Sequence, residues 1–203
     1  MHPINHCQFI NPLAAIASSL ILIACSSSND SGPIENQSVL TLLDGTWTRN
    51  CVAPPDEPFS VRDTVIIDGD TTERIRVTYS DTDCQLATSQ SSYDASIVYG
   101  ESVIPESGLI SQQVDLLVGE TRVTSLTEET TAQFNSQELC GANDYSTGID
   151  QVVSLECFPD LGEGMIFELW AVDGDRLLFG PEQALTVEER STTLGFTNPF
   201  FRQ

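Results

Sequence analysis

The sequence contains no lysine, and its only two histidines, His2 and His6, lie at the amino terminus. The absence of lysine excludes a Schiff-base amine and a phosphate-loop lysine, and the chain has no Gly-rich nucleotide-binding fingerprint. If residues 1–24 are removed, as argued below, no histidine remains to activate a serine or cysteine nucleophile or to bind zinc or iron. We therefore expect a protein that is not an enzyme and that holds no cofactor and no metal.

Positive charge is scarce throughout the chain. Thirty acidic residues face eight basic ones, all arginine, which gives a formal net charge of −22. A phosphate backbone would repel such a protein, so we expect no nucleic-acid partner. Three acidic pairs could offer oxygen ligands to calcium, but their Asp-Gly and Asp-Thr contexts are more typical of tight turns. These pairs are Asp68/Asp70, Asp81/Asp83 and Asp173/Asp175.

No apolar run is long enough to span a bilayer. Residues 13–24 are mainly Leu, Ile and Ala, but twelve residues fall short of the roughly 20 that a membrane helix needs. A short apolar run that ends in small residues is typical of a cleaved export signal. Its end, Leu22-Ile23-Ala24-Cys25, resembles the lipobox of bacterial lipoproteins.

This resemblance implies that Cys25 receives a diacylglyceryl group and becomes the first residue after cleavage. Ser26 in the second position favours the outer membrane, so we expect a lipid-anchored domain in the periplasm or at the cell surface. Residues 1–24 are then a lipoprotein signal peptide, residues 25–37 the lipidated cysteine and a disordered tether, and residues 38–203 the folded domain. The alternative is an ordinary signal peptide in which Cys25 is incidental, and no Lys or Arg precedes Cys25.

Four further cysteines follow Cys25, namely Cys51, Cys84, Cys140 and Cys157. An even number in an exported chain predicts two disulfides, for which three pairings exist. We favour Cys51–Cys84 with Cys140–Cys157, because each bond then closes one local unit. A four-thiolate metal site is the alternative, but it lacks any Cys-x-x-Cys pair.

The folded domain shows the two-residue period of β-strands. Residues 60–67 and 72–80 predict a hairpin around Asp68-Gly69-Asp70, with Ile75, Val77 and Tyr79 alternating with polar residues. Further strands are predicted at residues 85–91, 95–99, 114–118, 122–126, 151–155, 165–172 and 176–179. We therefore predict an all-β fold, a single antiparallel up-and-down barrel of about eight strands.

At most one short helix is expected, within residues 127–141. A capping box from Ser125 to Glu128 would begin this helix, and Gly141 would end it. Such a helix could plug one mouth of the barrel.

The motif Gly45-Thr46-Trp47 resembles the Gly-x-Trp signature of lipocalins and their calycin relatives. The layout also resembles bacterial lipoproteins with a lipocalin-like domain, through Cys51, Asp83-Cys84, Cys140-Gly141 and the tail Phe200-Phe201-Arg202. In these barrels the tryptophan closes one end, and a basic residue from the last strand packs across it. We match Arg190 to that basic residue, with Arg176 in reserve.

The resemblance implies a small apolar or amphipathic ligand inside the barrel. The ligand-binding residues suggested by it are Trp47, Tyr79 and Arg190, and further aromatic residues (Tyr93, Tyr99, Phe167 and Trp170) either line a cavity or fill the interior. The alternative is a structural or protein-interaction module with a filled barrel. A continuous apolar cavity of about 300 Å³ or more would favour the ligand-binding alternative. The membrane is the expected partner through the acyl chains on Cys25, and a protein partner is left open.

The lipobox prediction can be tested by mass spectrometry of the mature protein from its own host. We expect a chain that begins at Cys25 and carries the mass of two or three acyl chains, since one chain holds a protein only marginally at the membrane. An unmodified Cys25 thiol in the isolated protein would contradict the prediction.

Overall fold

The protein is described by a computed structural model over residues 42–203. The predicted signal peptide, Cys25 and the tether up to residue 37 lie outside the described residues. The strands are β1 (Gly45–Arg49), β2 (Ser60–Asp68), β3 (Thr71–Tyr79), β4 (Ala87–Val103), β5 (Ser111–Ser125), β6 (Asp150–Val153), β7 (Met165–Asp173), β8 (Arg176–Phe179) and β9 (Phe200–Arg202). The helical elements are α2 (Glu128–Gln137) and the 3₁₀ turns η1 (Leu139–Gly141), η2 (Leu155–Cys157) and η3 (Pro159–Leu161).

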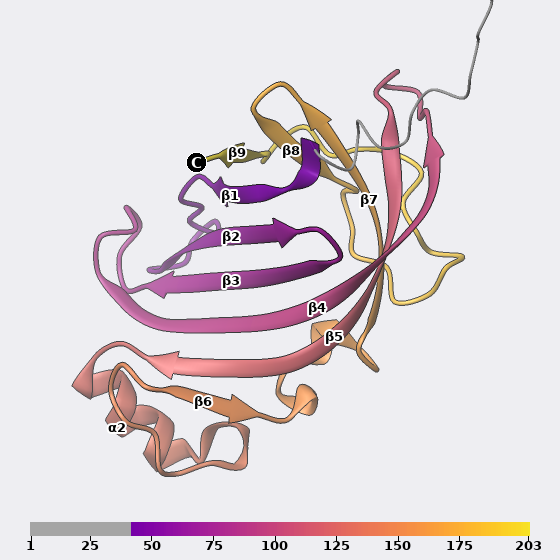
Figure 1. The fold of residues 1–203 in the computed structure, drawn as a ribbon. Helices are drawn as coiled ribbons and strands as arrows, with labels where there is room; N and C mark the ends of the chain where they lie inside the picture. Colours follow the sequence, from indigo (N-terminus) through magenta and orange to yellow (C-terminus); the bar gives the residue numbers. More distant parts are fainter. Residues whose placement is uncertain (1–41) are drawn as a thin grey trace, which may run out of the picture. The chain divides into compact units, whose positions relative to one another are not determined.

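Eight of these strands form a closed antiparallel barrel (Figure 1). Around the ring the order is β4-β3-β2-β1-β9-β8-β7-β5, and β5 pairs again with β4. Every neighbour in the ring is also the next barrel strand along the chain, except at the closure between β1 and β9. Strand β6 pairs only with the second half of β5 and stands outside the ring. The predicted all-β, up-and-down barrel with one short helix is confirmed.

The two longest strands each combine two predicted ones. Strand β4 merges the candidates at residues 85–91 and 95–99, and β5 merges those at 114–118 and 122–126. The pairing between β4 and β5 shifts register at two places, one of them just after Tyr93. Such a bulge adds one residue to one strand and bends it. The bulges interrupt the alternation, which explains why the sequence shows two short strands instead of one.

Helix α2 begins two residues later than the capping box predicted. Its N-cap is Thr127, whose side chain accepts a hydrogen bond from the Thr130 amide at 3.1 Å. Ser125 is the last residue of β5, and its hydroxyl contacts that of Thr131 instead. The helix lies against β5 and η1, beside β6 (Figure 1), so it does not plug the barrel as expected.

Both predicted disulfides are present. Cys51–Cys84 joins the segment after β1 to the turn after β3, and Cys140–Cys157 joins η1 to η2. The two bonds span 33 and 17 residues of sequence. Loops of this length stabilise the fold by about 3–4 kcal/mol each, mainly by restricting the unfolded chain.

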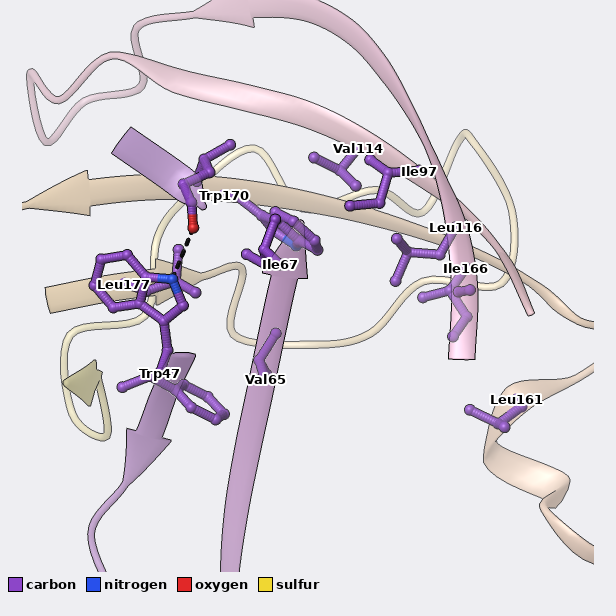
Figure 2. Close-up of a cluster of buried hydrophobic side chains, with 13 residues drawn as sticks. Trp47, Val65, Ile67, Ile97, Val114, Leu116, Leu161, Ile166, Trp170 and Leu177 are labelled. Carbon is purple, nitrogen blue, oxygen red and sulfur yellow. Dashed lines mark hydrogen bonds between the residues drawn. The ribbon is translucent and has the colours of Figure 1, made fainter. Parts of the chain in front are cut away.

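The main core gathers inward-facing side chains from most strands of the barrel. Trp47 and Trp170 are its largest members, and both are fully buried. The Trp47 indole donates to the Leu43 carbonyl at 2.8 Å, which satisfies its one polar atom (Figure 2). The buried residues of the cluster are Leu43, Trp47, Val65, Ile67, Ala95, Ile97, Val114, Leu116, Leu161, Ile166, Trp170, Leu177 and Phe200.

The basic residue that packs across Trp47 is Arg202. Its guanidinium carbon lies 4.1 Å from the centre of the indole ring, close enough for a cation–π interaction. The same guanidinium donates to the Asp44 carbonyl at 2.8 Å and to the Leu42 carbonyl. Arg202 therefore joins the closing strand β9 to the chain just before β1.

The assignment of this role to Arg190, or in reserve to Arg176, was wrong. Arg190 pairs with Asp115, and Arg176 pairs with Asp173. The last strand is β9, whose three residues are too few to show an alternating pattern, so the sequence pointed to arginines that precede it.

Gly45 has a physical reason to be glycine. Its φ is +134°, a backbone conformation that side chains disfavour. A Cβ atom at this position would lie 2.9 Å from Nη1 of Arg202. The glycine of the Gly-x-Trp motif thus leaves room for the arginine that covers the tryptophan.

We predict that Arg202→Met lowers the free energy of unfolding by about 1–2 kcal/mol, because it removes a cation–π contact and charged hydrogen bonds. Urea denaturation followed by circular dichroism measures this change. The control is Arg176→Met, which removes a surface ion pair worth about 0–1 kcal/mol. An equal loss in the two variants would contradict the role given to Arg202.

Candidate functional site

A cavity of about 500 Å³, open to solvent on one side, extends from the apolar core of the barrel to the protein surface. Strands β1 to β4 form one side of it, and Glu168 of β7, Phe179 of β8 and Phe200 of β9 form another. Residues 157–161 complete the wall. The volume exceeds the predicted threshold of about 300 Å³, but the wall is both polar and apolar instead of purely apolar.

Two arginines share one carboxylate in this wall. Asp63 on β2 accepts from Nε of Arg76 at 2.7 Å and from Nη1 of Arg49 at 3.2 Å. The register brings them together, because Asp63 is the partner of Arg76 across the β2–β3 pair. The hydrogen bond to Asp63 raises the pKa of Arg76. Burial lowers the pKa of Arg49; Asp63 partly offsets this, and the positive charges of Arg76 and Arg74 lower it further.

A second ion pair crosses the barrel interior from β3 to β7. The Arg74 guanidinium donates to both oxygens of Glu168, with an Nη1–Oε1 distance of 2.9 Å. The Trp170 indole also donates to Glu168. Burial lowers the pKa of Arg74, but the charge of Glu168 and a smaller contribution from Tyr93 raise it above its ordinary value. The side chains of Arg74 and Glu168 are only 17% and 7% exposed, so the pair lies largely out of contact with water.

Aromatic rings back the arginines. Trp170 packs edge-to-face on Phe179 with ring centres 5.5 Å apart, and Phe179 packs in the same way on Phe200 at 5.0 Å. The guanidinium carbon of Arg49 lies 4.5 Å from the centre of the Phe200 ring, and that of Arg74 lies 5.0 Å from the Phe179 ring. These contacts hold the two guanidinium groups in fixed positions in the wall.

The segment over residues 157–161 is held from both ends. Cys157 is bonded to Cys140, and Leu161 is buried in the main core. Between them Phe158 and Asp160 contribute an aromatic ring and a carboxylate to the wall. This segment, and no residue of α2, closes the cavity on that side.

None of the three predicted ligand-binding residues lines this cavity. Trp47 is fully buried in the core, and Tyr79 is buried at the end of β3 with Arg62 above its ring. Arg190 pairs with Asp115 away from the cavity. A ligand role for these residues remains a prediction, whereas Tyr93, from the wider aromatic set, does line the cavity.

Sequence reasoning missed the charged residues of the cavity. Alternation in β3 separates Arg74 and Arg76 from Ile75 and Val77, but it does not say which face is inside. The available signal was Glu168, a single acid in a strand that is otherwise apolar up to Val172. A carboxylate in a buried strand requires a cationic partner, which the arginines of β3 could supply.

One acid in each of two acidic pairs serves local structure. Asp81 accepts from the Gln85 amide at 3.0 Å, and Asp173 pairs with Arg176. Within residues 42–203 no group of three or more His, Cys, Asp or Glu side chains is placed to hold a metal ion. No helix in the same range is long and apolar enough to cross a membrane.

Comparison of the sequence with protein-family models and with curated proteins finds no match.

We predict that Glu168→Gln lowers the free energy of unfolding by about 3–5 kcal/mol, because it leaves the Arg74 charge buried without a partner. The double variant Arg74→Met/Glu168→Gln should recover most of the loss, since it removes the charge and keeps an oxygen for Trp170. Urea denaturation followed by circular dichroism measures both, with the exposed Glu188→Gln as control. A double variant that is less stable than the single one would contradict this account.

Proposed function

We propose that the protein is a lipid-anchored envelope protein that binds a small amphipathic molecule inside its barrel. The observation that supports this proposal most directly is the cavity of about 500 Å³ that extends from the core of the barrel to the surface. Ligand sites in β-barrels occur in such interiors and their mouths, with volumes of about 300–1,000 Å³.

The wall favours an amphipathic ligand over a purely apolar one. Arg49, Arg76 and Tyr93 place polar groups next to the rings of Phe179 and Phe200. A purely apolar molecule would take water away from the polar groups without replacing its hydrogen bonds, which costs about 1–3 kcal/mol for each group. A molecule with a polar end and an apolar body satisfies both parts of the wall.

We propose binding and not catalysis for this domain. Lysine is absent from the chain, and histidine is absent after His6. The three arginines of the cavity wall pair with Asp63 and Glu168, and Asp160 is the one carboxylate of the wall outside these ion pairs. The proposed location is the bacterial outer membrane, with the domain in the periplasm or at the cell surface; it rests on the lipobox-like motif that ends at Cys25.

A protein-interaction module is the second candidate function. Three apolar side chains on β4, β5 and β7 are well exposed, namely Val98 at 60%, Leu117 at 55% and Met165 at 39%. Leu117 and Met165 are partners across the β5–β7 pair, so they form a continuous apolar surface. This surface would suit a protein partner, and it does not require the cavity.

Binding in the cavity can be tested with N-phenyl-1-naphthylamine, a neutral probe whose emission rises in apolar surroundings. We expect saturable binding with a dissociation constant in the micromolar range. Ser91→Phe places a ring in the cavity wall and should weaken binding at least roughly tenfold, because probe and ring compete for one space. The control is Ser107→Phe, which adds the same ring at an exposed position.

Two outcomes would count against cavity binding. One is the absence of saturable binding to the wild-type protein, which would favour the interaction module. The other is an equal effect of the two phenylalanine variants, which would place the probe on the outer surface.

A further inference from the structure

We infer that the molecule in the cavity is a small organic anion, and that Arg49 and Arg76 bind its negatively charged oxygens beside Asp63. This inference rests on the proposed function and adds to it the chemical class of the ligand. It is carried by three independent features of the wall: the balance of charge around Asp63, the donors that have no partner, and the apolar surface next to them.

Arginine side chains are concentrated at this cavity. Three of the eight arginines of the chain line it, although the protein as a whole carries a net charge of −22. Arg74 is matched by Glu168, but Arg49 and Arg76 share Asp63 alone. One carboxylate therefore makes the ion pairs of two guanidinium groups, and Asp160, the third acid of the wall, pairs with neither of them.

The remaining acid in the wall, Asp160, compensates only weakly. Its charge acts on Arg76, but the residue is exposed, so water and salt screen it. The side chain of Arg49 is 29% exposed and that of Asp63 only 13%. The side chain of Arg76 is 55% exposed, so Arg49 alone lies on the partly buried side of the site, where an anion is attracted more strongly than at the surface.

Two donors in the wall have no partner within residues 42–203. The Nε atoms of Arg49 and Arg74 are buried and make no hydrogen bond to the protein. Buried donors of this kind are usually satisfied by water or by a ligand. A carboxylate or sulfonate has several acceptor sites and can serve one of these donors together with the outer edge of Arg76.

The apolar part of the wall determines the other end of the ligand. Phe158, Phe179 and Phe200 line the same cavity, and Leu161 lies between it and the core. A ring or a short chain can pack on these residues while the anionic group contacts the arginines. A cavity of about 500 Å³ sets the size of the whole molecule.

The test compares two probes that share one apolar body. 1-Anilinonaphthalene-8-sulfonate carries a sulfonate, and N-phenyl-1-naphthylamine is the same body without it. At constant ionic strength we expect the wild-type protein to bind the sulfonate at least roughly tenfold more tightly, the effect of one charged hydrogen-bonding group. Tighter or equal binding of the neutral probe would overturn the inference and leave the proposed function intact, whereas binding of neither would overturn both.

Matched variants then locate the anionic group. Arg76→Gln should weaken sulfonate binding roughly tenfold and leave the neutral probe unchanged; Arg176→Gln makes the same change in net charge away from the cavity and should affect neither probe. Asp63→Asn should act in the opposite direction and tighten sulfonate binding, because it releases both guanidinium groups. Asp173→Asn is its matched control. Because 1-anilinonaphthalene-8-sulfonate also binds partly unfolded proteins, the gain supports the inference only if binding of the neutral probe, which would report the same exposed apolar surface, stays unchanged. Equal effects of each variant and its control would overturn the inference.

Discussion

The barrel is closed by a strand of three residues, and the interior exists only because this closure holds. Strand β9 shares three residue pairs with β1 and two with β8. So few backbone hydrogen bonds give a weak seam, and side chains reinforce it. Arg202 covers Trp47 and binds the carbonyl groups of Leu42 and Asp44, while Phe200 enters the core. Closure also removes the two free edges that an open sheet would expose to other chains.

Within the closed ring, the apolar core and the charged cavity share one space. Trp170 belongs to both, since it is a fully buried core residue and donates to Glu168. Burying the Arg74–Glu168 pair costs solvation energy that a purely apolar interior would avoid. The gain is a wall whose polar groups are held in place by the strands and by the aromatic rings behind them. Such a wall would favour selective binding of a ligand, whereas a purely apolar interior would give a more stable fold.

The sequence predicted features that depend on local patterns. Alternation and turn residues indicated an all-β meander, and the spacing of the cysteines favoured the two disulfides that are present. Features that depend on distant contacts were not accessible in the same way. Arg74 and Glu168 are 94 residues apart, and nothing local shows that the polar face of β3 turns inward. Strand β9 escaped prediction for a different reason, because three residues cannot display a period of two.

The chain has two tryptophans, one at the closure of the barrel and the other beside the cavity. Trp47 lies under the arginine of the closing strand, whereas Trp170 contacts the ion pair at the cavity. Their indole groups therefore form a built-in pair of optical reporters, one for the seam and one for the pocket. In a variant that keeps only Trp47, a change in tryptophan emission on ligand binding would show that binding in the cavity alters the contact between β9 and β1.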